Sequence, residues 1–225
     1  MKIDILRFKP GRIDPPRFET FDLPAGKAMT VLDALEAIRL TRDPGLMYRH
    51  SCHHSACGTC AMRINGEERL ACVTRLGDLS SATLTLAPLK GFPVIADLVV
   101  DMTPLYADID PDWPYLRPSD TPLAKAAAEQ GATPALRLED CIECGCCVSA
   151  CPVVARDEAF MGPAALAALS NQMAKAAFDN DALLRLAGRP GGEPACRRAL
   201  FCSRVCPTGV YPARHIADLR RKRQK

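Results

Sequence analysis

Twelve of the 225 residues are cysteine, and the spacing of these cysteines is the strongest chemical signal in the chain. Cys52, Cys57 and Cys60 form a C-x4-C-x2-C run, and Cys72 follows after eleven further residues. A loop of this kind wraps its backbone around a small inorganic core, so that amide N–H groups point at the sulfur atoms. Most residues between these cysteines are small, so the backbone can approach the core closely. The spacing is typical of a plant-type [2Fe–2S] site, with Cys72 as the fourth ligand.

Three other chemistries explain only parts of this group. A thioredoxin-like dithiol at Cys57 and Cys60 leaves Cys52 and Cys72 without a role. A Rieske site needs a C-x2-H motif that the sequence lacks, and a four-cysteine zinc site usually has two C-x2-C pairs where this group has one. The two histidines that follow Cys52, at positions 53 and 54, are therefore predicted to be exposed loop residues.

The second half of the chain contains the other eight cysteines. Cys141, Cys144, Cys147 and Cys151 are spaced C-x2-C-x2-C-x3-C and are followed by Pro152, which is the complete bacterial ferredoxin run. In two-cluster ferredoxins, the fourth cysteine of such a run binds the other cluster. The first three cysteines are thus predicted to hold one cluster, and Cys151 to reach a second.

A reciprocal run follows but lacks one cysteine. It contains Cys196, Cys202 and Cys206, and Ala199 stands where a C-x2-C pair would place a ligand. By reciprocity, Cys206 completes a [4Fe–4S] site with Cys141, Cys144 and Cys147. Cys151, Cys196 and Cys202 then supply only three thiolates, which favours a [3Fe–4S] cluster. Cys146 is left over and is predicted to be a buried spectator thiol.

The elements that must position these cysteines differ between the two halves. In the first half, residues 2–8, 17–23 and 82–86 are predicted strands, and residues 62–64 and 69–73 form a hairpin around Asn65-Gly66. Thr30 is predicted to cap a helix that has Leu32, Leu35 and Ile38 on one face. In the second half, residues 164–178 and 208–225 are predicted helices. This order predicts an α+β chain, with a small mixed sheet followed by a helical part.

Domain boundaries follow from a proline-rich stretch between the two halves. Residues 1–105 are assigned to the first domain, 106–122 to an extended connector and 123–225 to the second domain. The formal net charge of +3 and the charged fraction of 24% are ordinary for a globular protein. No run is apolar enough to span a bilayer, and no secretory signal begins the chain, so a cytoplasmic location is expected. Reduced thiols in that compartment exclude a disulfide scaffold.

The order of these motifs resembles the iron–sulfur subunit of succinate dehydrogenase and fumarate reductase. The segment from Pro93 to Met102 and the sequence Gly162-Pro163-Ala164 are also similar to this family. The resemblance implies an N-terminal β-grasp ferredoxin domain and an all-helical, bacterial-ferredoxin-like second domain. It also implies a flavoprotein partner that carries FAD, and a membrane anchor that handles quinone and sometimes carries haem. The chain would then bind peripherally, through the anchor, to the cytoplasmic side of the membrane.

The resemblance has one departure. Ubiquinone-reducing members have a tryptophan five residues after the cysteine that corresponds to Cys151, and a histidine directly after the one that corresponds to Cys196. This chain has Arg156 and Arg197 at those positions, which are therefore candidate contacts for quinone or anchor. Residues 196–225 contain nine basic residues and one acid, which fits either a solvated tail or contact with anionic headgroups.

These residues predict an electron relay with no catalytic residue of its own, because no acid–base pair or nucleophile stands out. A free-standing ferredoxin-type carrier, a related flavoenzyme subunit that uses a thiol cofactor, and a zinc-binding interaction module are the alternatives. The thiol-cofactor branch carries a further cysteine-rich domain after the last cysteine, and only about twenty residues follow Cys206 here. Nucleic acid is not expected as a partner, because the basic C-terminal stretch lacks interleaved aromatic residues.

Overall fold

The computed structural model describes every residue except 25, 27, 110–140, 174–178 and 225. The chain divides into two compact units, and each consists of two stretches of sequence. The first unit is Met1–Pro104 with Ile142–Ala150, and the second is Leu105–Cys141 with Cys151–Lys225. Residues 142–150, which sequence analysis places in the second domain, pack with the residues of the first unit. Most of the predicted connector lies outside the described residues.

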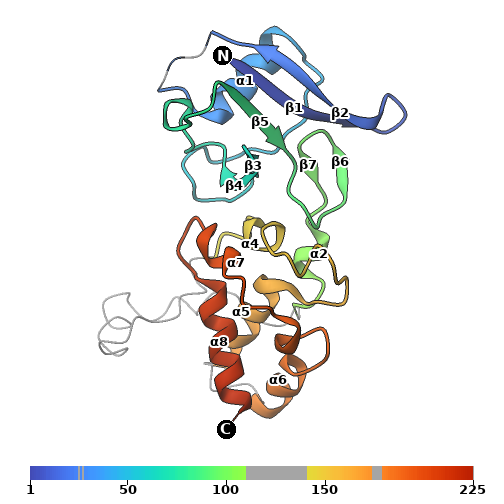
Figure 1. The fold of residues 1–225 in the computed structure, drawn as a ribbon, viewed down its shortest axis with the longest axis vertical. Helices are drawn as coiled ribbons and strands as arrows, with labels where there is room; N and C mark the ends of the chain where they lie inside the picture. Colours follow the sequence, from blue (N-terminus) through green and yellow to red (C-terminus); the bar gives the residue numbers. More distant parts are fainter. Residues whose placement is uncertain (25, 27, 110–140, 174–178, 225) are drawn as a thin grey trace. The chain divides into compact units, whose positions relative to one another are not determined.

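Sixteen described elements make up the two units (Figure 1). The strands are β1 (Lys2–Lys9), β2 (Ile13–Asp22), β3 (Ala61–Ile64), β4 (Glu67–Leu70), β5 (Thr83–Ala87), β6 (Val94–Ala96) and β7 (Val99–Val100). The α-helices are α1 (Val31–Thr41), α2 (Thr103–Tyr106), α4 (Cys146–Ser149), α5 (Gly162–Gln172), α6 (Asn180–Ala187), α7 (Phe201–Arg204) and α8 (Pro212–Arg223). Two 3-10 turns, η1 (Leu76–Asp78) and η2 (Glu193–Ala195), complete the set.

The first unit is built on a five-stranded mixed sheet with the strand order β2-β1-β5-β3-β4. β1 and β5 are parallel, and the other three neighbouring pairs are antiparallel. Helix α1 lies against this sheet (Figure 1). The core between them contains Ile3 and Ile5 from β1, Leu35 and Ile38 from α1, and Leu84 from β5, none of which is exposed. This arrangement confirms the predicted β-grasp architecture.

Local signals in the sequence account for the ends of these elements. Thr30 and Asp33 form the predicted capping box at α1, since the Asp33 N–H donates to Thr30 Oγ1 at 3.1 Å and the Thr30 N–H donates to Asp33 Oδ2 at 2.8 Å. Asn65 and Gly66 both adopt positive φ, as a type I′ hairpin turn requires, between β3 and β4. The second hairpin strand is shorter than predicted and ends at Leu70.

Two features of the first unit differ from the sequence expectation. Strand β2 begins at Ile13 and includes Pro15 and Pro16, because it is an edge strand and its register is irregular at that end. The small β6–β7 sheet was not predicted. Its two strands are too short to show a clear alternation of apolar and polar residues.

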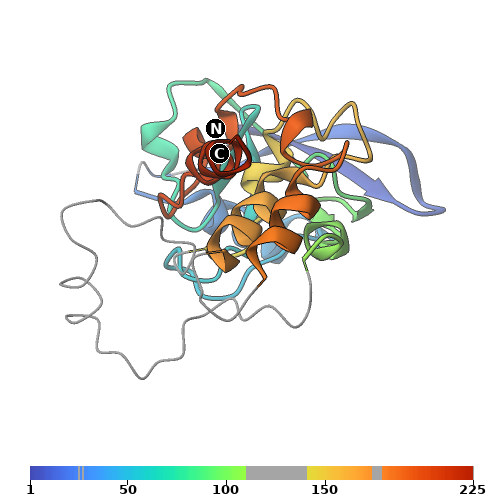
Figure 2. The same cartoon turned by 90° about the horizontal axis from the view of Figure 1, so that it is seen from below.

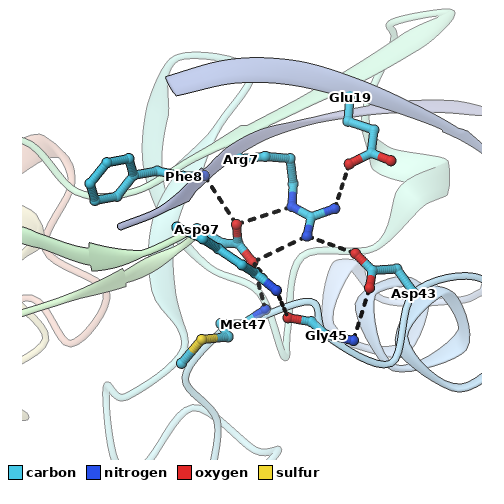
Figure 3. A network of polar contacts seen from close by, with 8 residues as sticks. Arg7, Phe8, Glu19, Asp43, Gly45, Met47 and Asp97 are labelled. Carbon is cyan, nitrogen blue, oxygen red and sulfur yellow. Dashed lines mark hydrogen bonds and ion pairs between the residues drawn. The ribbon is translucent and has the colours of Figure 1, made fainter. Parts of the chain in front are cut away.

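A buried ion-pair network joins β1 to the turn between β6 and β7 (Figure 3). Arg7 is 2% exposed and Asp97 is fully buried. Arg7 Nε donates to Asp97 Oδ1 at 3.0 Å, and the remaining guanidinium nitrogens pair with Glu19 at 2.6 Å and Asp43 at 2.7 Å. Asp97 Oδ2 also accepts the N–H of Met47 at 3.0 Å. The network therefore fixes the backbone that leads from α1 towards the first cysteine loop.

The second unit is helical, and α8 packs against α5 and α6 (Figures 1 and 2). Its core contains Leu166 and Leu169 of α5, Ala187 of α6, and Ile216 and Leu219 of α8, which are almost fully buried. Two of these helices had been predicted, with different ends. Helix α5 starts at Gly162 and ends at Gln172, and residues 174–178 of the predicted helix lie outside the described residues. Helix α8 starts at Pro212, not at position 208, because a proline at its first turn favours a start there.

Candidate metal centres

The first cysteine group forms a loop between α1 and β3, closed by the residues after β4. His53, Ser55 and Gly58 adopt positive φ, so the backbone turns repeatedly within the loop. These turns direct amide groups at sulfur. The N–H groups of residues 54, 56 and 57 donate to Cys52 Sγ at 3.5, 3.3 and 3.4 Å, and the Ser55 N–H donates to Cys72 Sγ at 3.3 Å. The chain thus supplies the backbone donors that an anionic cluster requires.

The four cysteines predicted for [2Fe–2S] come together in this loop. The Cys57 side chain lies beside Cys52, and the Cys60 side chain lies beside Cys72. The hydrogen bond from the Ser55 N–H to Cys72 Sγ joins the segment between Cys52 and Cys57 to the second pair. Backbone N–H groups, led by that of His54, lower the pKa of Cys52 to about 7, which favours the thiolate that binds metal. Burial raises the pKa of Cys60 to about 12. Four converging thiols with aimed N–H donors fit an iron–sulfur cluster.

Gly58 brings this loop against the segment that carries Cys144, within the first unit. A Cβ atom at Gly58 would lie 2.5 Å from the carbonyl oxygen of Ile142 and 2.8 Å from Cys144 Cβ. Such distances are closer than real Cβ contacts, so only glycine allows the two segments to approach this far. The residue also has a φ of +68°, which disfavours any side chain.

We expect Gly58→Ala to lower the content of both the [2Fe–2S] cluster and the cluster for which Cys144 is a predicted ligand. The added methyl group meets backbone atoms that cannot rotate away, and the positive φ costs a further ~1–2 kcal/mol. Iron analysis and the visible absorption of the purified protein measure the loss. Gly66→Ala is the matched control, because Gly66 has a φ of +85° with no atom within 4 Å of the added Cβ. Equal iron loss in both variants would show that backbone strain, and not the close approach, is responsible.

The four cysteines predicted for [4Fe–4S] do not all belong to one unit. Cys144 and Cys147 belong to the first unit, and Cys141 and Cys206 to the second, so this ligand set remains a prediction from sequence. Within the second unit, the Val210 N–H donates to Cys206 Sγ at 3.3 Å, which is a donor of the kind found in the first loop.

Cys146 lies beside Cys144 and is fully buried, as sequence analysis predicted. A hydrogen bond between the two side chains lowers the pKa of Cys144 to about 7. The same hydrogen bond, together with burial, raises the pKa of Cys146. A raised pKa favours the neutral thiol at Cys146, which fits a side chain that is not itself a ligand.

The three cysteines predicted for [3Fe–4S] line one cavity of about 410 Å³ in the second unit, and Ala199 lines it with them. Burial, followed by the neighbouring Cys151 and Cys196, raises the pKa of Cys202 to about 11, which places the three thiols close together. The residues on either side of Ala199, Arg198 and Leu200, have positive φ. Three thiols and one methyl group around a common cavity fit a three-iron cluster.

An ion-pair clamp that sequence analysis missed fixes the loop before Cys196. Glu193 is 2% exposed and pairs with Arg220 and, at 2.6 Å, with Arg223 of α8. Arg220 Nη2 also donates to the carbonyl oxygen of Cys196 at 3.4 Å. Two of the nine basic residues near the C-terminus are therefore structural. Two more, Arg221 and Lys222, pair with Asp218 at 3.0 and 3.1 Å.

The two arginines singled out in the sequence lie in different places. Arg197 is exposed and lines the cavity that contains Cys151, Cys196 and Cys202. Arg156 is exposed but does not line this cavity, and its N–H donates to the Val153 carbonyl in a turn at 2.9 Å. The structure thus links Arg197, and not Arg156, to the third cysteine group.

Comparison with known proteins finds two family models that match successive parts of the chain. Residues 2–107 match the model of a 2Fe-2S iron-sulfur cluster binding domain, and residues 137–210 match that of a 4Fe-4S dicluster domain. The fumarate reductase iron-sulfur subunit of Mycobacterium tuberculosis is 36% identical over 221 residues, which cover 94% of this chain and 87% of that protein. The succinate dehydrogenase iron-sulfur subunit of Coxiella burnetii is 35% identical over 228 residues, which cover 98% and 95%.

The fold has a counterpart among solved structures. A chain of the Mycobacterium smegmatis Sdh1 complex in the apo form matches with a TM-score of 0.83 at 23% identity, over 99% of this chain and 94% of that one. Among the residues that the structure describes, no helix has the length and apolar character needed to cross a membrane.

Proposed function

The chain belongs to the family of iron–sulfur subunits of succinate dehydrogenase and fumarate reductase, and we propose that it relays electrons between the FAD of a flavoprotein subunit and a membrane quinone. The observation that carries this proposal is the set of three cysteine groups, two with four cysteines each and one with three. The relay serves either succinate oxidation or fumarate reduction. Bond-breaking chemistry belongs to the flavin site of the partner, and this chain supplies no catalytic residue.

Three clusters bound by this chain would serve as its one-electron carriers. Cys52, Cys57, Cys60 and Cys72 would hold [2Fe–2S], as the backbone donors around Cys52 and Cys72 support. Cys141, Cys144, Cys147 and Cys206 would hold [4Fe–4S], which rests on the ferredoxin spacing. Cys151, Cys196 and Cys202 would hold [3Fe–4S], as their shared cavity with Ala199 supports.

The packing of the first unit favours electron transfer from the first cysteine loop to the segment that carries Cys144. Gly58 allows that loop to touch Ile142 and Cys144 directly, so one wall of each cluster site is shared. Electron transfer depends on such close approach. We infer that the [2Fe–2S] site passes electrons on to the [4Fe–4S] site, and the family resemblance implies that it receives them from the flavoprotein.

The surface around the third cavity fits the exit to quinone. Leu200 is 50% exposed and Phe201 is 45% exposed, and both line the cavity beside Arg197. Exposed large apolar residues next to a cation suit the end of a membrane anchor subunit. The chain would then attach to the cytoplasmic side of the membrane through that anchor, where haem is a further possible carrier.

The complex with the flavoprotein and anchor subunits provides the direct test. Each chain should contain about nine irons, and the oxidised complex should give a [3Fe–4S] signal in low-temperature EPR. Succinate should reduce the clusters in the complex but not in the isolated chain. If dithionite reduces the clusters of the complex, but succinate does not reduce them and fumarate does not reoxidise them, the proposed relay is wrong, and a free-standing carrier becomes the better explanation.

We expect Arg197→Ala to slow quinone-linked turnover of the complex about tenfold, while reduction of an artificial dye that accepts electrons upstream stays nearly unchanged. A guanidinium beside the cavity donates charge-assisted hydrogen bonds to a quinone carbonyl or an anchor carboxylate, and their loss costs ~1.5–3 kcal/mol. Arg185→Ala is the control, because Arg185 is exposed on α6 and does not line the cavity. A parallel fall in both activities would assign Arg197 to assembly of the complex.

A further inference from the structure

Three side chains that sequence analysis left without a role converge in the first unit. Glu36 lies on α1, and His50 and His53 lie on the loop that enters the first cysteine group. His50 Nδ1 is 3.1 Å from His53 Nε2. Glu36 Oε1 is 3.8 Å from each of these two nitrogens, which is longer than a hydrogen bond, so neither ring satisfies the carboxylate.

The three atoms enclose a point that suits a metal ion. With separations of 3.1, 3.8 and 3.8 Å, the point equidistant from all three lies about 2.1 Å from each. Zn–N distances in proteins are ~2.0–2.1 Å and Zn–O distances ~2.0–2.2 Å. A slight contraction of the two longer separations would lift the ion out of the plane and leave room for water. The existing positions therefore need little rearrangement to bind an ion.

Neighbouring groups hold the ligands in place. His53 has a φ of +62°, a conformation that a non-glycine residue rarely adopts, and its ring meets the His50 ring edge-on at 5.3 Å. The Tyr48 ring centroid lies 5.3 Å from that of His50, and the Tyr48 hydroxyl accepts a hydrogen bond from Arg39 Nε at 3.2 Å. These ring contacts restrict the orientations of the two imidazoles.

We propose that Glu36, His50 and His53 form a site for an exchangeable divalent cation of the zinc class, separate from the cluster ligands. Two imidazoles and one carboxylate favour Zn²⁺ over Mg²⁺ or Ca²⁺, which prefer oxygen ligands alone. The side chains of Glu36, His50 and His53 are 30%, 35% and 44% exposed, so water completes the coordination and the ion exchanges with solvent. Both rings must be neutral, with a lone pair on the inward nitrogen.

Zn²⁺ binding to the purified, cluster-loaded protein tests this site. The protein is titrated against a chromophoric zinc chelator of known affinity, while iron content and cluster absorption are followed in the same samples. We expect one Zn²⁺ per chain with no loss of iron. His50→Gln and Glu36→Gln should each weaken Zn²⁺ binding at least about tenfold, because each removes one of three protein ligands.

Glu67→Gln is the matched control, since Glu67 is an exposed carboxylate of the same unit on β4 that pairs with Arg69 at 2.6 Å. It should bind Zn²⁺ as the unaltered protein does. The proposal is overturned if the unaltered protein binds no Zn²⁺, if His50→Gln and Glu36→Gln bind it with unchanged affinity, or if uptake occurs only with equivalent loss of iron. The last result would place Zn²⁺ at the cysteines. None of these outcomes depends on whether the chain relays electrons.

Discussion

The Ala199→Cys variant is expected to contain a second [4Fe–4S] cluster in place of the three-iron cluster. Ala199 lines the same cavity as Cys151, Cys196 and Cys202, and the substitution restores the C-x2-C-x2-C-x3-C run of a complete ferredoxin site. A fourth thiolate adds both a ligand and a negative charge. Iron should rise to about ten per chain, and the EPR signal of the oxidised complex should disappear. The added charge should also lower the reduction potential of this cluster.

The same cavity offers a control for this variant. Ala213 also lines it, but from α8 and outside the ferredoxin spacing. Ala213→Cys therefore adds a thiol to the cavity without completing the run, and the three-iron signal should persist. An unchanged signal in Ala199→Cys would mean that the ligand assignment of the third group is wrong. Loss of the signal in both variants would mean that the cavity accepts a fourth thiolate from either wall.

The sequence alone predicts local structures that depend on the spacing of nearby residues. The C-x4-C-x2-C loop, the capping box at Thr30 and the turn at Asn65-Gly66 each involve residues within eight positions of one another. A short segment restricts its own backbone geometry, so the residue types report the conformation directly. The β-grasp architecture and the helical character of the second part followed from these signals together with the family resemblance.

Contacts between distant residues could not be predicted in this way. Arg7 and Asp97 are 90 positions apart, and Glu193 reaches Arg220 from 27 positions away. Each of these residues looks like an ordinary surface charge in sequence, because burial is a property of the folded chain. The packing of residues 142–150 on the first unit has the same origin. It depends in part on Gly58, whose close approach to Ile142 and Cys144 shows only when the opposing backbone is in place.

The Asp97→Asn variant tests whether the buried network secures the first cysteine loop. Asparagine keeps the size of the side chain and tolerates the positive φ of 45° at this position, but it removes the charge that Arg7 pairs with. The N–H groups of Phe8 and Met47 also lose their carboxylate acceptor. We expect Asp97→Asn to destabilise the first unit by about 3 kcal/mol. The buried Arg7 cation keeps fewer partners, and the hydrogen bonds of the two backbone N–H groups become weaker.

Because a cluster-loaded, two-part chain does not unfold in one reversible step, the rate of cluster loss is the suitable measurement. Bleaching of the visible absorption at a fixed urea concentration should be up to about 100-fold faster in Asp97→Asn, since each 1.36 kcal/mol corresponds to a factor of ten. Glu19→Gln is the control, because Glu19 contacts the same guanidinium but its side chain is 48% exposed, and exposed pairs contribute about 1 kcal/mol or less. Equal bleaching rates in the two variants would show that the burial of Asp97 does not contribute to the stability of the first cysteine loop. A much faster rate in Asp97→Asn alone would show that the backbone at Met47, only five residues before Cys52, depends on this carboxylate.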